Sequence, residues 1–469
     1  MSSQIHGPAL PYMAEGRHTA DSSEDVPETM SPYQVTVHRC LCVLIVSLIF
    51  EGIARKAAPS FLGVFIFFFK DFVTCALLFM CIYGGQNAVT SRLLKLMGVW
   101  TFVLLPCIIS TALRDPILAL FGVKQYALFP TIAAAMSAAY LPGNRRHLFS
   151  LIRLIALSLI VTTLVAVAQN RLPAGNWLNL SVAGEDMSGF SAGGYLRVSS
   201  TFSFCGQYCF YLNALCFCLP AVFYYNQFSG GWAPKTRLIV LVGLFIAGTF
   251  LTGSRASVLG NVVILGVGGL LAIWFEGTKA ILKVLVPVCL GISLLGLLQT
   301  IEPELFAAYE ARMAAPEDLA EVETRIKSDF LDWMYGWVEA PPTGLGYGLG
   351  VMSNGSDKIS PYAAGWRGGG LWTETDRATT FFEGGWYLMI IWYGFRLWII
   401  IYTLMLLFKM QTSELRLMGA FAWGYILVIG VMGTLAIQPP LAIWWWLAVG
   451  LIICLGQFDG EPPVKETDP

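Results

Sequence analysis

The stretch GGWYLMIIWYGFRLWIIIYTLMLLF at residues 384–408 consists of 25 residues, most of them large and apolar. A helix of this length can cross the ~30 Å hydrocarbon core of a bilayer. Similar apolar stretches recur along the chain, near 38–54, 59–83, 93–113, 124–141, 148–168, 200–226, 238–252, 256–275, 280–299, 416–436 and 440–457. We therefore predict an all-α fold, a polytopic membrane helix bundle of about 12 transmembrane helices.

The composition limits the classes of function. Of the 469 residues, 56% are hydrophobic and 13% are charged, and the formal net charge is −1. With no basic patch, the sequence gives no reason to expect nucleic acid as a partner. All 11 cysteines lie in apolar segments without the spacing of metal ligands, so we expect neither a metal nor a cofactor.

Basic residues predict the orientation of the helices. Five alternate loops carry two basic residues each, namely Arg92/Lys95, Arg145/Arg146, Lys235/Arg237, Lys279/Lys283 and Lys409/Arg416. The positive-inside rule makes these loops cytoplasmic, together with both termini. The predicted order is a disordered cytoplasmic tail (1–37), helices 1–9 (38–299), a large outer loop (300–382), helices 10–12 (383–457) and a second cytoplasmic tail (458–469).

Charged residues at membrane depth are costly unless paired, which makes them functional candidates. Glu51 and Arg55 share a helix face, and Lys70 and Asp71 lie within the second apolar stretch. These four side chains could form a structural network between two helices or serve a function. Arg114, just beyond the third stretch, could bind substrate or anchor the helix at the interface.

Two further arginines stand among small hydroxylated residues at the outer boundary. Arg197 lies in Arg197-Val-Ser-Ser-Thr-Phe-Ser203, and Ser254 and Arg255 lie in Leu251-Thr-Gly-Ser-Arg-Ala-Ser257, which interrupts an apolar run. Planar guanidinium donors match phosphate oxygens, and small neighbours let backbone amides approach them. The same arginines could instead cap a helix end or pair with a loop carboxylate.

The outer loop combines aromatic residues with charged ones. Arg325 precedes a glycine-rich stretch, Gly344–Gly350, and Glu374, Arg377 and Glu383 follow it near the start of the next helix. Sugars stack on aromatic rings and their hydroxyls bond to carboxylates, so this loop suits sugar recognition. For each tryptophan alone, a place in the interfacial aromatic belt is the competing interpretation.

Together these motifs resemble the O-antigen ligase and O-antigen or exopolysaccharide polymerase superfamily of polytopic membrane proteins. The resemblance covers roughly residues 38–457 and rests on the two arginine motifs, the glycine-rich stretch and the closing Glu383-Gly-Gly385. It implies a metal-independent glycosyltransferase in the bacterial inner membrane, acting on undecaprenyl-diphosphate-linked glycans at the periplasmic face. Its expected partners are a lipid-linked oligosaccharide donor, a glycan or lipid acceptor, membrane lipids and other polysaccharide export proteins.

The resemblance maps the arginines of the family onto Arg197 and Arg255, and more weakly onto Arg325. Ligases of this family typically have a histidine in the outer loop. This chain has His6, His18, His38 and His147, all in predicted cytoplasmic positions. A polymerase is therefore favoured over a ligase, which would transfer the glycan to a lipid A core or another acceptor.

The chemistry assigns a role to each candidate. Arg197 and Arg255 would stabilise the departing diphosphate, with Arg114, Arg377, Arg325 and Ser254 binding substrate. Glu374, or else Glu383, would be the general base for an inverting transfer. A secondary transporter is the rival from another class, because paired intramembrane charges are typical of carriers.

Overall fold

The computed structural model describes residues 30–84, 87–185, 195–229, 235–314, 327, 344–368 and 375–459. Within these ranges the chain is helical and contains no strand, which confirms the all-α class. The predicted residues Arg325 and Glu374 lie outside the described ranges.

Nine described helices are long and apolar enough to cross a membrane. They are α1 (Pro32–Ala57), α2 (Ser60–Tyr83), α3 (Ala88–Ala112), α6 (Arg145–Arg171), α7 (Cys205–Ser229), α9 (Arg255–Glu276), α16 (Asp376–Lys409), α17 (Ser413–Met432) and α18 (Pro439–Phe458).

One bent segment is apolar enough to form either a tenth, broken span or a re-entrant loop. It comprises α4 (Pro116–Val123), the π-helical turn η1 (Lys124–Leu128) and α5 (Thr131–Ala139), with a bend of 46° before α5. Two further apolar helices are α8 (Lys235–Leu251) and α10 (Thr278–Ile301). Their described apolar parts, Arg237–Leu251 and Gly291–Ile301, are shorter than a membrane span. Each of the twelve predicted stretches thus lies largely in a helix, whereas a count of twelve crossings stays a prediction.

Several helices begin earlier than the sequence predicted, and two of them show the cause. Ser31 caps α1 and forms a capping box with Gln34, which extends the helix into the predicted N-terminal tail. The Thr375 hydroxyl caps α16 by accepting from the Ala378 amide, so this helix includes the last residues assigned to the outer loop.

Contacts between helix termini divide the bundle into two ends. Asn144 donates to Gln34 at 3.1 Å and joins the starts of α6 and α1, and Arg416 contacts Glu276 at 2.5 Å, joining α17 to the end of α9. We call this the Ser31 end. The five basic pairs predicted for cytoplasmic loops belong to helices that begin or turn here, and which side of the membrane this end faces stays a prediction.

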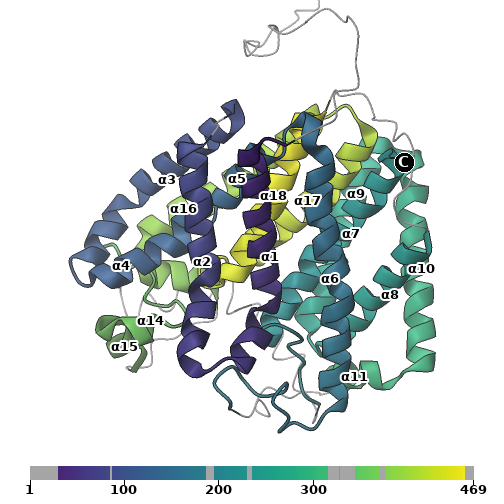
Figure 1. Cartoon of the computed structure of the whole chain (residues 1–469), viewed down its shortest axis with the longest axis horizontal. Coiled ribbons are helices and arrows are strands. Elements are labelled where there is room, and N and C mark those ends of the chain that lie inside the picture. Colours follow the sequence, from purple (N-terminus) through teal and green to yellow (C-terminus); the bar gives the residue numbers. More distant parts are fainter. Residues whose placement is uncertain are drawn as a thin grey trace, which may run out of the picture.

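The opposite end carries the short helices of the long loop. These are α11 (Glu304–Ala314), α14 (Ser356–Ile359) and α15 (Pro361–Gly368), which lie at the bottom of Figure 1, away from the start of α1. Arg171 and Glu302 pair there at 3.1 Å and join the ends of α6 and α10. We call this the Arg197 end.

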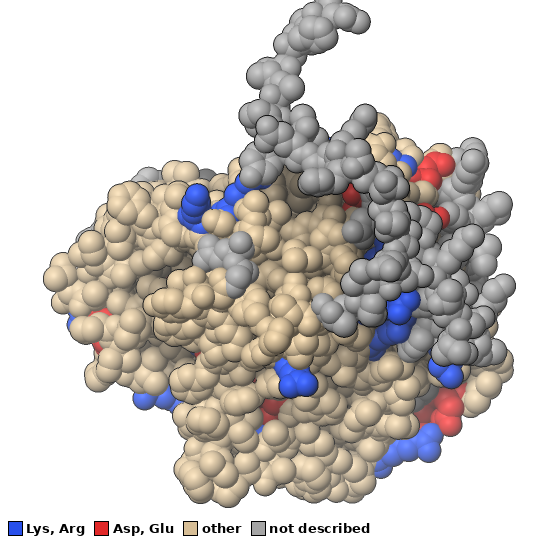
Figure 2. Space-filling model, turned by 45° about the horizontal axis from the view of Figure 1, so that its top comes forward, with Lys and Arg blue, Asp and Glu red and all other residues tan. Residues whose placement is uncertain are grey.

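Small residues let the central helices touch. A Cβ atom on Gly424 of α17 would lie 2.8 Å from the backbone nitrogen of Gly268 in α9, so the two backbones are in contact. The face seen in Figure 2, by contrast, has few charges among the described residues, and large apolar side chains such as Phe61 and Leu113 are exposed. This distribution fits a bundle whose solvent is lipid.

Candidate functional site

The segment that carries Arg197 is bound tightly to α1. The Thr201 hydroxyl donates to the carbonyl of Ile49 at 2.6 Å, and the Ile53 amide donates to the carbonyl of Thr201 at 2.9 Å. Gly52 allows this approach, because a Cβ atom there would lie 1.9 Å from the carbonyl carbon of Phe202. The segment therefore takes its position from the last turns of α1.

The same segment is also bound to α6. The Ser200 amide donates to Gln169 Oε1 at 2.7 Å, and the Ser200 hydroxyl donates to the carbonyl of Thr162 at 2.6 Å. Ser200 has a φ of 54°, the single left-handed non-glycine residue in the described chain. Such a conformation costs about 1–3 kcal/mol and persists only where surrounding contacts impose it. The hydrogen bonds of Ser200 supply those contacts.

The second arginine motif forms the break between α8 and α9. Gly253 has a φ of +58°, a conformation that glycine adopts without strain. Ser254 stands at the N-cap position of α9, but its side chain makes no capping hydrogen bond. The first amides of α9 are thus left without this side-chain cap at the positive end of the helix dipole.

The fold brings the two motifs together. Gly253 packs against Arg197 and against Ala308 of α11, since a Cβ on Gly253 would lie 3.8 Å from Arg197 Cγ and 3.3 Å from Ala308 Cβ. Arg197 Nε and Ser257 Oγ are both buried without a hydrogen-bond partner in the described residues. A polar ligand bound at this point would supply the missing partners of both atoms.

A polar network fixes the helices around this site. Asn213 of α7 donates to Asn261 of α9 at 2.7 Å, and Asn261 donates to Thr249 of α8 at 3.0 Å. These side chains are buried. Because each side chain donates a hydrogen bond to the next one, the network holds α7, α8 and α9 at a fixed spacing next to the α8–α9 break.

Glu383 lies elsewhere, at a kink in α16. Its side chain is fully buried, with Oε2 accepting from the Tyr126 hydroxyl and Oε1 from the Met352 amide, both at 2.8 Å. Gly385, where α16 kinks, has a φ of +62°. Both carboxylate oxygens of Glu383 therefore hold neighbouring segments in place.

The glycine-rich loop wraps around this kink. The Tyr347 amide donates to the carbonyl of Phe382 at 2.7 Å, and a Cβ on Gly346 would lie 2.6 Å from the Glu383 carbonyl carbon. Arg114 donates to the carbonyl of Gly346 at 2.9 Å. Arg114, predicted to bind substrate, thus makes a structural contact with this loop.

Asp115 adds a second clamp on the loop region. Its carboxylate accepts from the Ser360 hydroxyl at 2.5 Å and from the amides of Ile117 and Leu118 at the start of α4. The Ser360 hydrogen bond, followed by these amides, holds the pKa of Asp115 below its usual value, and partial desolvation opposes the shift.

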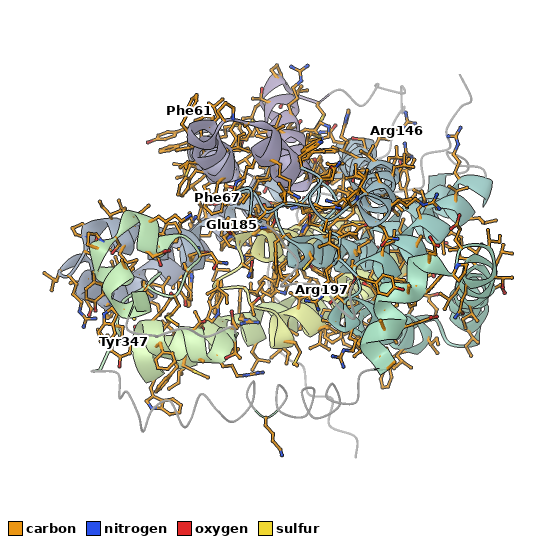
Figure 3. The ribbon with its side chains drawn as sticks, turned by 90° about the horizontal axis from the view of Figure 1, so that it is seen from below. Phe61, Phe67, Arg146, Glu185, Arg197 and Tyr347 are labelled. Carbon is orange, nitrogen blue, oxygen red and sulfur yellow. The ribbon has the colours of Figure 1, made fainter. Side chains whose placement is uncertain are left out.

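Arg377 stands at the start of α16. It donates to the carbonyl of Val431 at 3.3 Å, and its guanidinium lies 5.9 Å from the centre of the Tyr393 ring. Of the predicted site residues that the structure describes, Arg197 packs on Gly253 in the α8–α9 break, next in sequence to Ser254 and Arg255. Glu383 and Arg114 belong to the contacts of the glycine-rich loop, as Figure 3 indicates by the separate positions of Arg197 and Tyr347.

Two supporting residues escaped prediction from the sequence. Gln169 lies near the end of α6 and is buried against Ser200 and the carbonyl of Leu178. Tyr126 lies 257 positions before its partner Glu383. The polar Gln169 directly after an apolar stretch could have been recognised in the sequence as a candidate. Nothing in the sequence near Tyr126 indicates that its partner is Glu383.

Comparison with protein-family models, with curated proteins and with solved structures finds no match to this chain.

Proposed function

We propose that this protein is a membrane glycosyltransferase that joins undecaprenyl-diphosphate-linked glycans at the Arg197 end, most simply as a polysaccharide polymerase. The observation that supports the proposal is the meeting of Arg197 with the α8–α9 break, where Arg197 Nε and Ser257 Oγ are buried without partners. Such an arrangement suits an anionic oxygen-rich group such as a diphosphate.

In the proposed reaction, the donor sugar leaves its diphosphate when the bond between the anomeric carbon and the phosphate oxygen breaks. The oxygen of a hydroxyl on the acceptor glycan forms the new bond to that anomeric carbon, and the proton of the hydroxyl passes to a base. The diphosphate departs as an anion, so Arg197 and Arg255 would stabilise the charge that develops on it. Backbone amides at the start of α9 would add to this effect.

The general base is proposed to be Glu374, which lies outside the described residues. Glu383 is the weaker candidate because its two oxygens already accept hydrogen bonds from Tyr126 and Met352. One of these bonds would have to open before Glu383 could take a proton from an acceptor.

The test uses purified protein in vesicles containing lipid-linked single repeat units, with chain length as the readout. Arg197→Ala and Arg255→Ala should each lower product formation by about 10²–10³-fold, as for the loss of one donor to a developing anion. Arg171→Ala is the matched control, since Arg171 lies at the same end but its side chain is 59% exposed and pairs with Glu302.

The same assay distinguishes the alternatives. Long chains that remain on the lipid carrier support a polymerase, whereas transfer to a lipid A core, added to a parallel set of vesicles, supports a ligase. If the substrate crosses the vesicle membrane without a new glycosidic bond, the protein is a transporter and the proposal is wrong. Full activity of both arginine variants would also contradict it.

A further inference from the structure

A second charged cluster lies beside the Arg197 segment, between α1 and α2. Lys70 donates to Glu51 Oε2 at 2.8 Å, and Arg55 pairs with Glu51 Oε1 at 3.3 Å. The hydroxyl of Ser203, at the end of the Arg197 motif, also donates to Glu51, at 3.3 Å. Of the predicted four-residue network, the contacts of Glu51 with Arg55 and Lys70 are confirmed, whereas Asp71 pairs with Lys124 instead. Through Ser203 the network reaches the segment that carries Arg197.

The cluster also includes Lys124 of η1, the π-helical turn between α4 and α5. Lys124 pairs with Asp71 at 3.0 Å, and its ammonium lies 4.2 Å from the centre of the Phe121 ring. Phe67 lies beneath the cluster, with Lys70 at 4.2 Å and Arg55 at 5.1 Å from its ring centre. Phenyl faces attract cations and exclude water, so the positive charges are held in an apolar setting.

The charges of this cluster do not balance. Among the residues that the structure describes, Arg55, Lys70 and Lys124 supply three positive charges, whereas Glu51 and Asp71, their ion-pair partners, supply two negative ones. An unbalanced charge at membrane depth costs several kcal/mol, and an anion would remove that cost. The cluster also lacks one hydrogen-bond donor, because Asp71 Oδ1 is buried without a partner in the described residues.

Two cations of the cluster are partly exposed, whereas the third is buried. The side chains of Arg55 and Lys124 are 21% and 11% exposed, whereas that of Lys70 is 2% exposed. The flanking surface is strongly apolar, with Phe61 of α2 and Leu120 of α4 both 73% exposed. A ligand that combines an anionic group with a hydrocarbon chain would match both features.

The position of the cluster relates it to the proposed donor site. Ser203 bonds to Glu51, while Arg197, six residues earlier, packs on Gly253. In Figure 3, which looks at the Arg197 end, Phe61 lies at the margin and Phe67 lies closer to the middle, where Arg197 is found. The cluster and the donor arginines are therefore joined by one short segment.

We infer that Arg55, Lys70 and Lys124 form a second phosphate site, which holds the lipid diphosphate of the acceptor glycan. This inference rests on the proposed function and makes it more specific. A polymerase joins two lipid-linked glycans and needs two such sites, whereas a ligase needs one for its donor. The esterified diphosphate has no proton to donate, so the unpartnered Asp71 Oδ1 would accept a hydrogen bond from a hydroxyl of the first sugar or from a bound water.

The test measures how many equivalents of geranylgeranyl diphosphate, a short polyprenyl diphosphate, bind to the purified full-length protein. The wild type should bind two. Arg55→Gln should weaken one of them by about 10- to 100-fold, the effect of losing a charge-assisted hydrogen bond. Arg55→Lys keeps the charge and is the matched control. Arg255→Ala should weaken the other equivalent and spare this one.

A second variant guards against misfolding. The double substitution Lys124→Gln with Asp71→Asn removes both charges of one pair, so that neither is left buried alone. It should weaken the same equivalent as Arg55→Gln.

The remaining outcomes refute specific claims. If the wild type binds a single equivalent that Arg255→Ala alone weakens, the acceptor site is wrong and the proposed function stands. If Arg55→Gln alone weakens that single equivalent, the cluster binds the diphosphate but the donor arginines do not, which contradicts the proposed function. One equivalent weakened by both variants indicates one shared site and overturns the inference. Displacement of the second equivalent by equimolar phosphatidylglycerol would also overturn it, because the site would then accept any anionic lipid.

Discussion

The contact between α1 and the Arg197 segment can be tested with a single methyl group. In Gly52→Ala the new Cβ would lie 1.9 Å from the carbonyl carbon of Phe202 and 2.2 Å from the Ser203 amide nitrogen. Ordinary van der Waals contact begins at 3.4 Å, so α1 and the segment must separate by about 1.5 Å. The obstacle is backbone on both sides, so no side-chain rotation can relieve it.

Two effects should follow from this separation. Overpacking of this kind costs about 1–3 kcal/mol of stability, which should appear as a lower unfolding temperature in detergent. A misplacement of about 1 Å at a catalytic group can cost about 10²-fold in rate, and the segment carries Arg197 directly. We therefore expect glycan joining to fall by about two orders of magnitude while the protein still folds.

Gly63→Ala provides the matched control. Gly63 lies in α2, and a Cβ there would meet no heavy atom within 4 Å. Alanine is favoured over glycine inside a helix by about 0.5–1 kcal/mol, so this variant should be at least as stable as the wild type and equally active. If Gly52→Ala behaves like Gly63→Ala in both assays, the close packing of α1 on the segment is wrong.

Three further predictions concern the other contacts. Glu383→Ala should destabilise the protein by about 2–4 kcal/mol in thermal unfolding, because two buried donors lose their acceptor. Glu383→Gln keeps an acceptor oxygen and should retain most of the activity. Equal damage by both variants would indicate that the charge of Glu383 is required. Asp376→Ala should cost about 3–5 kcal/mol, since it leaves the guanidinium of Arg396 buried without its carboxylate; a wild-type unfolding temperature would contradict this. The pKa of Asp115 is lowered in the folded state, so its stabilising effect is complete above the usual aspartate pKa and is lost as the pH falls through the lowered value. Protease cleavage of the 344–368 region should therefore begin at a higher pH in Ser360→Ala than in the wild type, and an unchanged onset would count against the clamp.

The sequence predicted the helices well because their signal is local. Each apolar stretch is long enough to be recognised without knowledge of its neighbours, since the bilayer sets the length. The break before Arg255 was also predictable, because Thr252-Gly253-Ser254 interrupts an apolar run with residues that favour a turn. The helix starts were less accurate, because caps such as Ser31 and Thr375 lie in polar sequence outside the apolar stretch.

The partners of charged residues were harder to predict. The pair Glu51 and Arg55 follows from helical spacing, but the bond from Ser203 to Glu51 joins positions 152 residues apart. Glu383 was chosen from its place near a loop-to-helix junction, and its contacts with Tyr126 and Met352 depend on how distant segments fold around it. A single sequence contains no pattern for such contacts, because tertiary packing creates them.

The last turns of α1 offer a physical reason why the two proposed phosphate sites would act together. Residues four apart share a helix face, so Glu51 and Arg55 form one stripe, which faces Lys70 of α2. Gly52 and Lys56 form the adjacent stripe, and both contact the Arg197 segment: Gly52 meets Phe202, and Lys56 donates to Ser199 at 3.3 Å. A rotation or shift of this helical turn would therefore move both stripes at once. An acceptor bound at the cluster would in this way bias the position of Arg197, and binding of either substrate should then change the affinity for the other by the same factor.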